Sequence, residues 1–381
     1  MPQFYLPTEI LTGRGCFDQL GKVVARYGKR ALLVCGANFA RRSGLLDRAV
    51  ELLQDAGVQV TVFDGVRGEA ALPMVQVGIE LARQEGCRVP VGLGGGSAID
   101  VAKAIAGLMD LPGPLVEYHN GRPPEKPALP WVAVPTTAGT GAEVTRNAVL
   151  IDPTEGVKKS IRDDSWFARA ALVDPLTTVS MPPQVTASTG SDALAQAIES
   201  FTSIAAGPIT DALAMRAIAL IGAHLERAYR DGQDLEAREA MSMGSLMAGM
   251  AMASARLGGI HGIAHPLGSH FDIPHGVVCG LLLPYVMAYN LDYAAEKYAQ
   301  VAALLGEPTE GLPIRAAAER AVERVRRLMR AIDLPEHLGP FGVRPIHFEQ
   351  IIAETLPSGS TKHNPRPLGA EDVRAILEQA I

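Results

Sequence analysis

The sequence predicts two domains, an α/β domain followed by an all-helical domain. The chain has 381 residues, which is long for a single hydrophobic core. Its first half alternates short β-rich runs with amphipathic helical stretches, a pattern typical of a mostly parallel sheet with helices on both faces. After the prolines at 182 and 183, apolar residues recur almost everywhere at helical spacing. We therefore expect domains at residues 1–180 and 181–381.

In the first domain, strands are predicted where aliphatic residues run together, and helices where apolar residues repeat every three or four positions. The predicted elements, in order, are a strand at 31–36, a helix at 45–57, a strand at 58–65, a helix at 74–86, a strand running into the glycines of 89–97, a helix at 98–109 and a strand that opens the segment 131–143.

In the second domain, helices are predicted at 184–203, 208–229, 234–257, 259–268, 276–289, 293–305, 313–332 and 370–380. The methionine-rich run at 241–252 has helical spacing, and it is read as flexible core filling.

Composition limits the partners. The net charge is −6, so no basic surface favours nucleic acid or an anionic membrane. No apolar run reaches the length of a membrane span, and the N-terminus lacks the basic and apolar regions of a signal peptide. No CxxC pair occurs, which is typical of reduced thiols in a cytoplasmic protein. The four cysteines are Cys16, Cys35, Cys87 and Cys279.

Two glycine-rich turns follow predicted strands. A turn of small residues at a helix start brings backbone N–H groups to an anion such as a pyrophosphate. Each turn could also serve packing alone, and Thr140 with Glu143 could form a capping box. Neither turn is a GxGxxG or Walker motif, but together they favour a dinucleotide crevice. The residues that would line it are Gly94, Gly95, Gly96, Ser97, Asp100, Thr136, Thr137 and Thr140.

Three histidines interrupt an apolar segment of the second domain. His261 and His265 are four residues apart and share a helix face, while His275 follows a proline. On an earlier helix, Asp192 and Gln196 have the same spacing. Asp192, His261 and His275 would offer a divalent ion oxygen and nitrogen ligands. The alternative is a set of hydrogen-bonded core histidines and an aspartate that complements a helix dipole.

Four motifs, in this order and with these separations, resemble the iron-dependent (group III) alcohol dehydrogenase family. The resemblance covers essentially the whole chain. It implies a dehydroquinate synthase-like fold, with an N-terminal nucleotide domain, an all-helical C-terminal domain and a metal in the cleft between them. The motifs are GGGSAIDVAK (94–103), PTTAGTGAEVT (135–145), GSDALAQAIES (190–200) and HGIAHPLGSHFDIPHG (261–276).

The resemblance assigns roles to individual residues. Asp192, His261 and His275 match metal ligands, and His265 matches the histidine near the nicotinamide. Gln196 stands where the family has a fourth ligand, a histidine. A glutamine carbonyl is a weaker donor than imidazole for iron or zinc. We therefore expect weakly held Fe²⁺ or Zn²⁺, with His265 as the catalytic proton relay.

The cofactor implied by the resemblance is NAD(P)(H). Lys158 matches a lysine that touches the cofactor, although Lys159 leaves the register open. Gly36 stands where NAD-specific members often carry an aspartate, and Asn38 follows in the same turn. With Arg41 and Arg42 close by, NADP is permitted, so the prediction leans to NADPH. The arginines could equally be solvated surface.

The predicted function is NAD(P)-dependent interconversion of a small alcohol and its aldehyde or ketone, assisted by a divalent metal as the resemblance implies. The alternatives are a metal-independent maleylacetate-type reductase, a lyase of the dehydroquinate synthase type, and a catalytically degenerate nucleotide-binding protein. Arg146 could anchor an acidic aldehyde or form a surface ion pair. An exposed strand within the first thirty residues could pair across a homodimer.

Overall fold

The computed structural model describes residues 3–37 and 42–381. The chain divides into two compact units. One comprises residues 6–137 and 141–180, and the other comprises residues 1–5, 138–140 and 181–381. The second unit therefore takes in a short piece of the turn that follows the strand at 132–135.

The first unit is built on a six-stranded sheet in which every pairing is parallel. Strand order is β1-β8-β5-β4-β2-β3. β1 lies at one edge of the sheet. Only an edge strand could pair with a second copy of the chain, as the dimer prediction for the first thirty residues supposes. The strands are β1 (Glu9–Thr12), β2 (Arg30–Gly36), β3 (Gln59–Val66), β4 (Val89–Gly94), β5 (Val132–Pro135) and β8 (Ala170–Val173).

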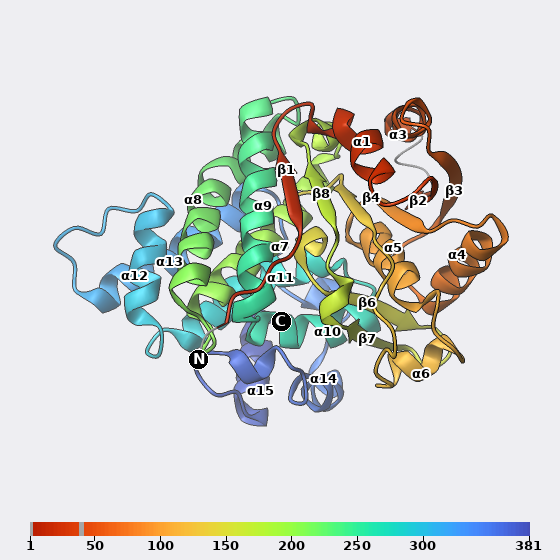
Figure 1. The fold of residues 1–381 in the computed structure, drawn as a ribbon. Helices are drawn as coiled ribbons and strands as arrows, with labels where there is room; N and C mark the ends of the chain where they lie inside the picture. The colour runs from red at the N-terminus through yellow and green to blue at the C-terminus, as the bar shows by residue number, and fades with distance from the viewer. Residues whose placement is uncertain (1–2, 38–41) are drawn as a thin grey trace. The chain divides into compact units, whose positions relative to one another are not determined.

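Side chains of β2 alternate between two cores, as a strand covered on both faces requires. Leu32 and Val34 pack with apolar residues of α4 and α5, whereas Leu33 and Cys35 pack with those of α1 and α3. Figure 1 shows these helices around the sheet. The parallel sheet covered by helices, predicted from the alternating pattern, is confirmed. The helices are α1 (Leu20–Ala25), α3 (Leu45–Asp55), α4 (Leu72–Gln84), α5 (Gly96–Leu108) and the short α6 (Leu115–His119).

An antiparallel hairpin, β6 (Asn147–Asp152) and β7 (Val157–Arg162), was not foreseen. Lys103 of α5 anchors it, because the buried Nζ donates to the Asn147 carbonyl at 2.7 Å. The same Nζ lies 3.2 Å from Asp100 Oδ1, and Asp100 Oδ2 accepts from the Val149 backbone. Burial lowers the pKa of Lys103 and raises that of Asp100. This ion pair fixes the hairpin on α5.

The second unit is helical, as predicted, and its helices share one large core. Figure 1 shows α7, α8 and α9 running side by side. The predicted boundaries agree with the structure to within three residues, and α14 was missed because its apolar pattern covers only two turns. The helices are α7 (Pro183–Thr202), α8 (Pro208–Arg230), α9 (Leu235–Ala255), α10 (Gly259–Phe271), α11 (His275–Asn290), α12 (Ala295–Leu304), α13 (Ile314–Ala331), α14 (Phe348–Thr355) and α15 (Ala370–Ala380).

Among the described residues, α8 alone meets the length and composition of a membrane-crossing helix. It buries Ile218, Ile221 and Leu225 in the shared core. A core helix of a globular protein passes the same test, so this helix is weak evidence for a span.

Glu143 makes the stability of the first unit depend on pH. It lies in a short 3-10 helix, Ala142–Val144, whose N-cap is Gly141 and not Thr140. Burial raises the pKa of Glu143 to about 7. The folded protein therefore keeps a proton that the unfolded chain releases above its ordinary pKa of 4.5. The contribution of this protonated Glu143 to the free energy of unfolding is complete below pH 4.5 and is lost as the pH rises through 7.

Replacing Glu143 with glutamine should therefore stabilise the protein at pH 8 relative to the wild type by up to about 3 kcal/mol, and much less at pH 5. Thermal unfolding of both proteins between pH 4.5 and pH 8 measures the difference. Glu155→Gln, on the exposed turn between β6 and β7, is the control and should show no such trend. A constant difference for Glu143→Gln at all pH values would contradict the assignment.

Candidate metal centre and nucleotide-binding turn

The buried polar side chains of helix α7 include Asp192, Gln196 and Glu199. Their spacing of four and three residues places them along one face of the helix. The rest of this part of α7 is alanine, leucine and isoleucine, which bury into the core. Buried polar groups of this kind need partners, and those come from α10 and α11.

Helix α11 approaches α7 closely because Gly276 and Gly280 lack side chains. A Cβ atom at Gly276 would lie 2.0 Å from the Ser188 backbone oxygen, and one at Gly280 would lie 2.8 Å from the Ser191 Cβ. The Ser191 hydroxyl donates to the Gly276 carbonyl at 2.9 Å. This close contact brings the first turn of α11, with His275 and Cys279, against Asp192.

Asp192, His261, His275 and Cys279 form one cluster, in which a ligand atom of each lies within 4.8 Å of those of the others. The Asp192 Oδ1 atom is 3.3 Å from His261 Nε2 and 3.8 Å from His275 Nε2. The Cys279 Sγ atom is 3.6 Å from His275 Nε2 and 3.9 Å from His261 Nε2. The structure thus brings together three of the four predicted metal ligands and adds a thiol.

Glu199 fixes the orientation of the His261 ring. Its Oε2 lies 2.6 Å from His261 Nδ1, and its Oε1 accepts from the Ile260 backbone at 2.7 Å. With Nδ1–H donated to the carboxylate, Nε2 faces the cluster with its lone pair, the arrangement found in metal-binding histidines. Glu199 therefore acts on the site through His261.

The cluster favours a positive charge. Burial alone would raise the pKa of Asp192, but the neighbouring His261 and His275 imidazoles lower it. Burial alone would lower the pKa of His261, but Cys279, Glu199 and Asp192 raise it well above its ordinary value. Both directions follow from the buried acidic groups of the cluster, which favour a positive charge beside them.

Two buried oxygen atoms of this site, Asp192 Oδ1 and Gln196 Oε1, lack a hydrogen-bond partner among the described residues. Gln196 donates from Nε2 to Asp192 Oδ2 at 2.9 Å, which leaves its carbonyl as its only free ligand atom. Unpartnered buried oxygens are costly. A cation next to the two imidazoles would satisfy Asp192 Oδ1, so this donor set fits a divalent metal.

His265 lies next to this cluster but outside its set of possible ligands. Its ring centroid is 5.5 Å from that of His275, and the side chain is only half-buried. A partly exposed imidazole beside the site is suited to proton exchange with solvent.

The predicted nucleotide-binding turn of the first unit starts at the end of β4. Helix α5 begins at Gly96, two residues earlier than predicted, and no side chain caps its first turn. The Thr136 backbone donates to the Gly94 carbonyl at 2.9 Å. A Cβ atom at Gly95 would lie 3.3 Å from the Thr137 side chain. The two predicted turns therefore meet, so Gly94, Gly95, Gly96 and Ser97 lie beside Thr136 and Thr137.

The other predicted cofactor residues have structural partners. Asp100 bonds Lys103 and the Val149 backbone, and Lys158 lies 2.6 Å from Glu69. Gly36 ends β2. Thr140 belongs to the short segment that clusters with the helical unit. Asn38 and Arg41 lie outside the described residues.

Cys279 is the site residue that sequence reasoning missed. The sequence presents it as one of four scattered cysteines with reduced thiols. Its position four residues after His275, on one face of a helix, is a signal that could have revealed it. Burial raises the pKa of the free thiol to about 12.

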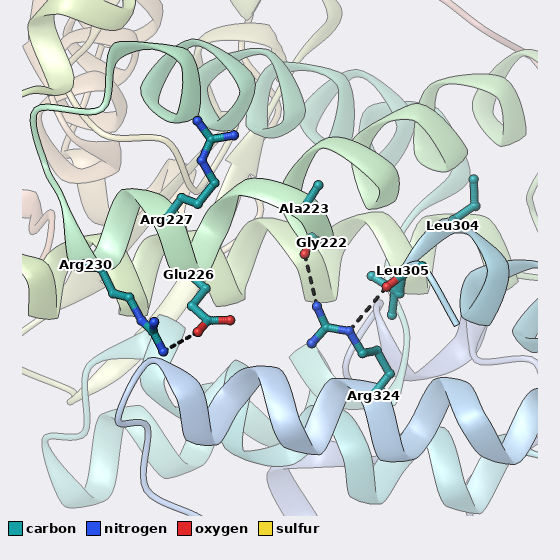
Figure 2. Close-up of a pocket in the computed structure, with 9 residues that line it drawn as sticks. Gly222, Ala223, Glu226, Arg227, Arg230, Leu304, Leu305 and Arg324 are labelled. Atoms are coloured by element: carbon teal, nitrogen blue, oxygen red, sulfur yellow. Dashed lines mark hydrogen bonds and ion pairs between the residues drawn. The ribbon is translucent and has the colours of Figure 1, made fainter. Parts of the chain in front are cut away.

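A pocket of about 290 Å³ lies elsewhere in the helical unit, between α8, α12 and α13 (Figure 2). Its arginines are engaged: Arg230 pairs with Glu226, and Arg324 donates to two backbone carbonyls. Arg227 pairs with Asp234 and Glu236. The pocket therefore offers no uncompensated charge for an anionic ligand.

Comparisons with known proteins agree with the fold. The chain is 36% identical to NAD-dependent methanol dehydrogenase of Bacillus methanolicus over 382 residues, covering both proteins completely. It is 40% identical to 1,3-propanediol dehydrogenase of Klebsiella pneumoniae over 354 residues, or 93% of this chain and 92% of that one. The crystal structure of a 1,3-propanediol oxidoreductase superposes with a TM-score of 0.97 at 38% identity over both full chains.

Fold and relatives define an oxidoreductase of the alcohol dehydrogenase class. The family model described as iron-containing alcohol dehydrogenase matches residues 7–175, and the C-terminal model of the Fe-containing alcohol dehydrogenase family matches residues 186–381. The chain belongs to the iron-containing alcohol dehydrogenase family, as the four motifs predicted.

Substituting Glu199 with glutamine should weaken metal binding by about 10- to 100-fold, because the His261 ring loses the carboxylate that orients it and raises its basicity. Competition with a chromophoric chelator measures the affinity. Glu354→Gln is a matched control. Glu354 pairs at 2.7 Å with His270, which lies on α10 like His261, but this pair is exposed. Unchanged affinity in Glu199→Gln would contradict the role given to Glu199.

Proposed function

We propose that this protein interconverts a small alcohol and its aldehyde or ketone by hydride transfer with NAD(P)(H), with a divalent metal ion at the Asp192 cluster. The observation that carries the proposal is the convergence of Asp192, His261 and His275 around a buried carboxylate oxygen that has no hydrogen-bond partner among the described residues. Relatives with the same fold include an NAD-dependent methanol dehydrogenase and 1,3-propanediol dehydrogenases.

The residues of the chain would divide the work as follows. Asp192, His261 and His275 would hold the ion, whose chemistry is Lewis-acid polarisation of the substrate oxygen. Glu199 keeps His261 in the tautomer that presents Nε2 to the site. His265, half-buried beside His275, would exchange the hydroxyl proton with solvent.

The nucleotide would bind at the start of α5. Uncapped N–H groups in the first turn of a helix, approached through glycines, suit a pyrophosphate. Gly36 supports the preference for NADPH, because no carboxylate stands there to repel a 2′-phosphate. Arg42 is exposed close to it in sequence.

The main alternative, a metal-independent maleylacetate-type reductase, has less support. The unpartnered Asp192 oxygen favours a bound cation. An acidic substrate would need a cationic anchor. Arg146 was one candidate, but it forms an ion pair with Asp164, which is the alternative that the sequence left open for it. The intact cluster also argues against a degenerate nucleotide-binding protein, because unused buried polar groups would only destabilise the fold.

Removal of the metal tests the proposal. Dialysis against a strong chelator should reduce aldehyde-dependent NAD(P)H oxidation by at least about 100-fold, since polarisation by a metal contributes several kcal/mol. Zn²⁺ or Fe²⁺ should restore the activity, and circular dichroism should confirm that the metal-free protein is folded. A panel of simple aldehydes and oxoacids belongs in the same assay. Full activity in protein shown to be metal-free, especially with oxoacids, would establish the alternative instead.

Cofactor preference is tested at Gly36. A Cβ atom there meets only the Val66 carbonyl, at 3.8 Å, so an aspartate fits. Gly36→Asp should raise the KM for NADPH by at least about tenfold, or about 1.4 kcal/mol, while that for NADH changes little. Gly36→Asn, which has the same shape without the charge, is the control. Equal effects of Gly36→Asp on both cofactors would remove the argument for NADPH.

A further inference from the structure

We infer that Cys279 is the fourth strong metal ligand of this protein, so that its site is an Asp–His–His–Cys set with a preference for Zn²⁺. This inference rests on the proposed function, because it concerns the same metal site. It assigns the fourth position to a thiolate of α11 in place of Gln196 of α7. The Lewis-acid role in the proposed function would then use the five-coordinate state that catalytic zinc can reach.

The distances within the cluster match a tetrahedral zinc site. Bonds of about 2.3 Å to sulfur and about 2.0–2.1 Å to nitrogen and oxygen, at tetrahedral angles, place each nitrogen roughly 3.6 Å from the sulfur and roughly 3.3 Å from the oxygen. The Cys279 Sγ atom lies 3.6 and 3.9 Å from the two Nε2 atoms. The Asp192 Oδ1 atom lies 3.3 and 3.8 Å from them. One ion can therefore contact all four atoms with small side-chain shifts.

Position on the helix makes Cys279 a natural ligand. His275 and Cys279 are one turn apart on α11, so both face α7 across the contact that Gly276 and Gly280 allow. Cys279 is fully buried, and its sulfur lies within 4 Å of the two imidazole nitrogens that would share the ion. A cysteine used only for packing would have no reason to face two metal-ligand nitrogens.

Gln196 acts as a positioning residue in this arrangement. Its Nε2 donates to Asp192 Oδ2 at 2.9 Å. Turning the amide around would place two oxygen atoms against each other, so the N–H side is fixed toward the carboxylate. This bond leaves Asp192 Oδ1, the oxygen without a hydrogen-bond partner among the described residues, to face the two imidazoles.

Charge balance favours the same assignment. Binding of a divalent ion would release the thiol proton of Cys279 to solvent and form a metal–sulfur bond. Two anionic ligands and two neutral imidazoles then neutralise the ion inside a buried site, which avoids the cost of an uncompensated charge. Sulfur and nitrogen ligands in tetrahedral geometry select Zn²⁺ over Fe²⁺ or Mg²⁺.

Cobalt substitution tests the inference without reference to activity. Metal-free full-length protein is loaded with Co²⁺, and its near-ultraviolet and visible spectra are recorded for the wild type, Cys279→Ser and Cys279→Ala. A thiolate ligand gives a charge-transfer band that oxygen and nitrogen ligands do not give. We expect the band in the wild type and its loss in both variants. Cys87→Ser, at a buried cysteine of the first unit, is the matched control and should keep it.

Zinc affinity provides a second measurement on the same proteins. Loss of the Cys279 ligand should weaken Zn²⁺ binding by at least about 100-fold. Loss of the hydrogen-bond partner of a ligand already costs up to about 100-fold, and loss of the ligand itself should cost more. Fe²⁺ binding should weaken less. Thermal unfolding of the metal-free variants confirms that they are folded. If a variant fails to fold, the wild-type cobalt spectrum alone decides.

The outcomes separate this inference from the proposed function. Cobalt bound without the charge-transfer band, or with the band unchanged in Cys279→Ser, overturns the role of Cys279 and leaves a metal site of Asp192 and the histidines. Absence of cobalt binding by the folded wild type overturns both. Loss of the band in the Cys279 variants alone supports the four-ligand set.

Discussion

The site depends on one buried carboxylate oxygen, Asp192 Oδ1, which has no hydrogen-bond partner among the described residues. Leaving such an atom unpartnered is expensive, and the fold surrounds it with donors suited to a cation. His261 and His275 present Nε2 atoms, and Cys279 adds a sulfur. Glu199 holds the His261 proton on the opposite side of the ring. The cluster is therefore organised for a metal ion.

Packing of α7 against α11 makes this arrangement possible, because two glycines on α11 allow the helices to touch. The first unit uses a comparable device. There, the ion-paired Lys103 and Asp100 of α5 bond the Asn147 carbonyl and the Val149 N–H of β6. In both units a buried ionisable group sets the position of a neighbouring element.

Sequence reasoning predicted the parallel sheet, the long helices and the membership of the alcohol dehydrogenase family, because periodicity and ordered motifs are local signals. It missed the β6–β7 hairpin, whose anchor, Lys103, lies in a distant helix. It also missed Cys279, since composition alone presents a lone cysteine as an inert thiol. Gln196 was recognised as unusual, but the hydrogen bond that turns its amide toward Asp192 exists only in the folded chain. Such features arise from contacts between elements, which no local pattern encodes.

The chain would then be an alcohol dehydrogenase of this family whose metal is held partly by sulfur. X-ray absorption at the edge of the metal that copurifies with the protein tests this claim most directly. The account predicts zinc with one sulfur neighbour at about 2.3 Å and three nitrogen or oxygen neighbours at about 2.0–2.1 Å. A metal shell composed only of nitrogen and oxygen would contradict it.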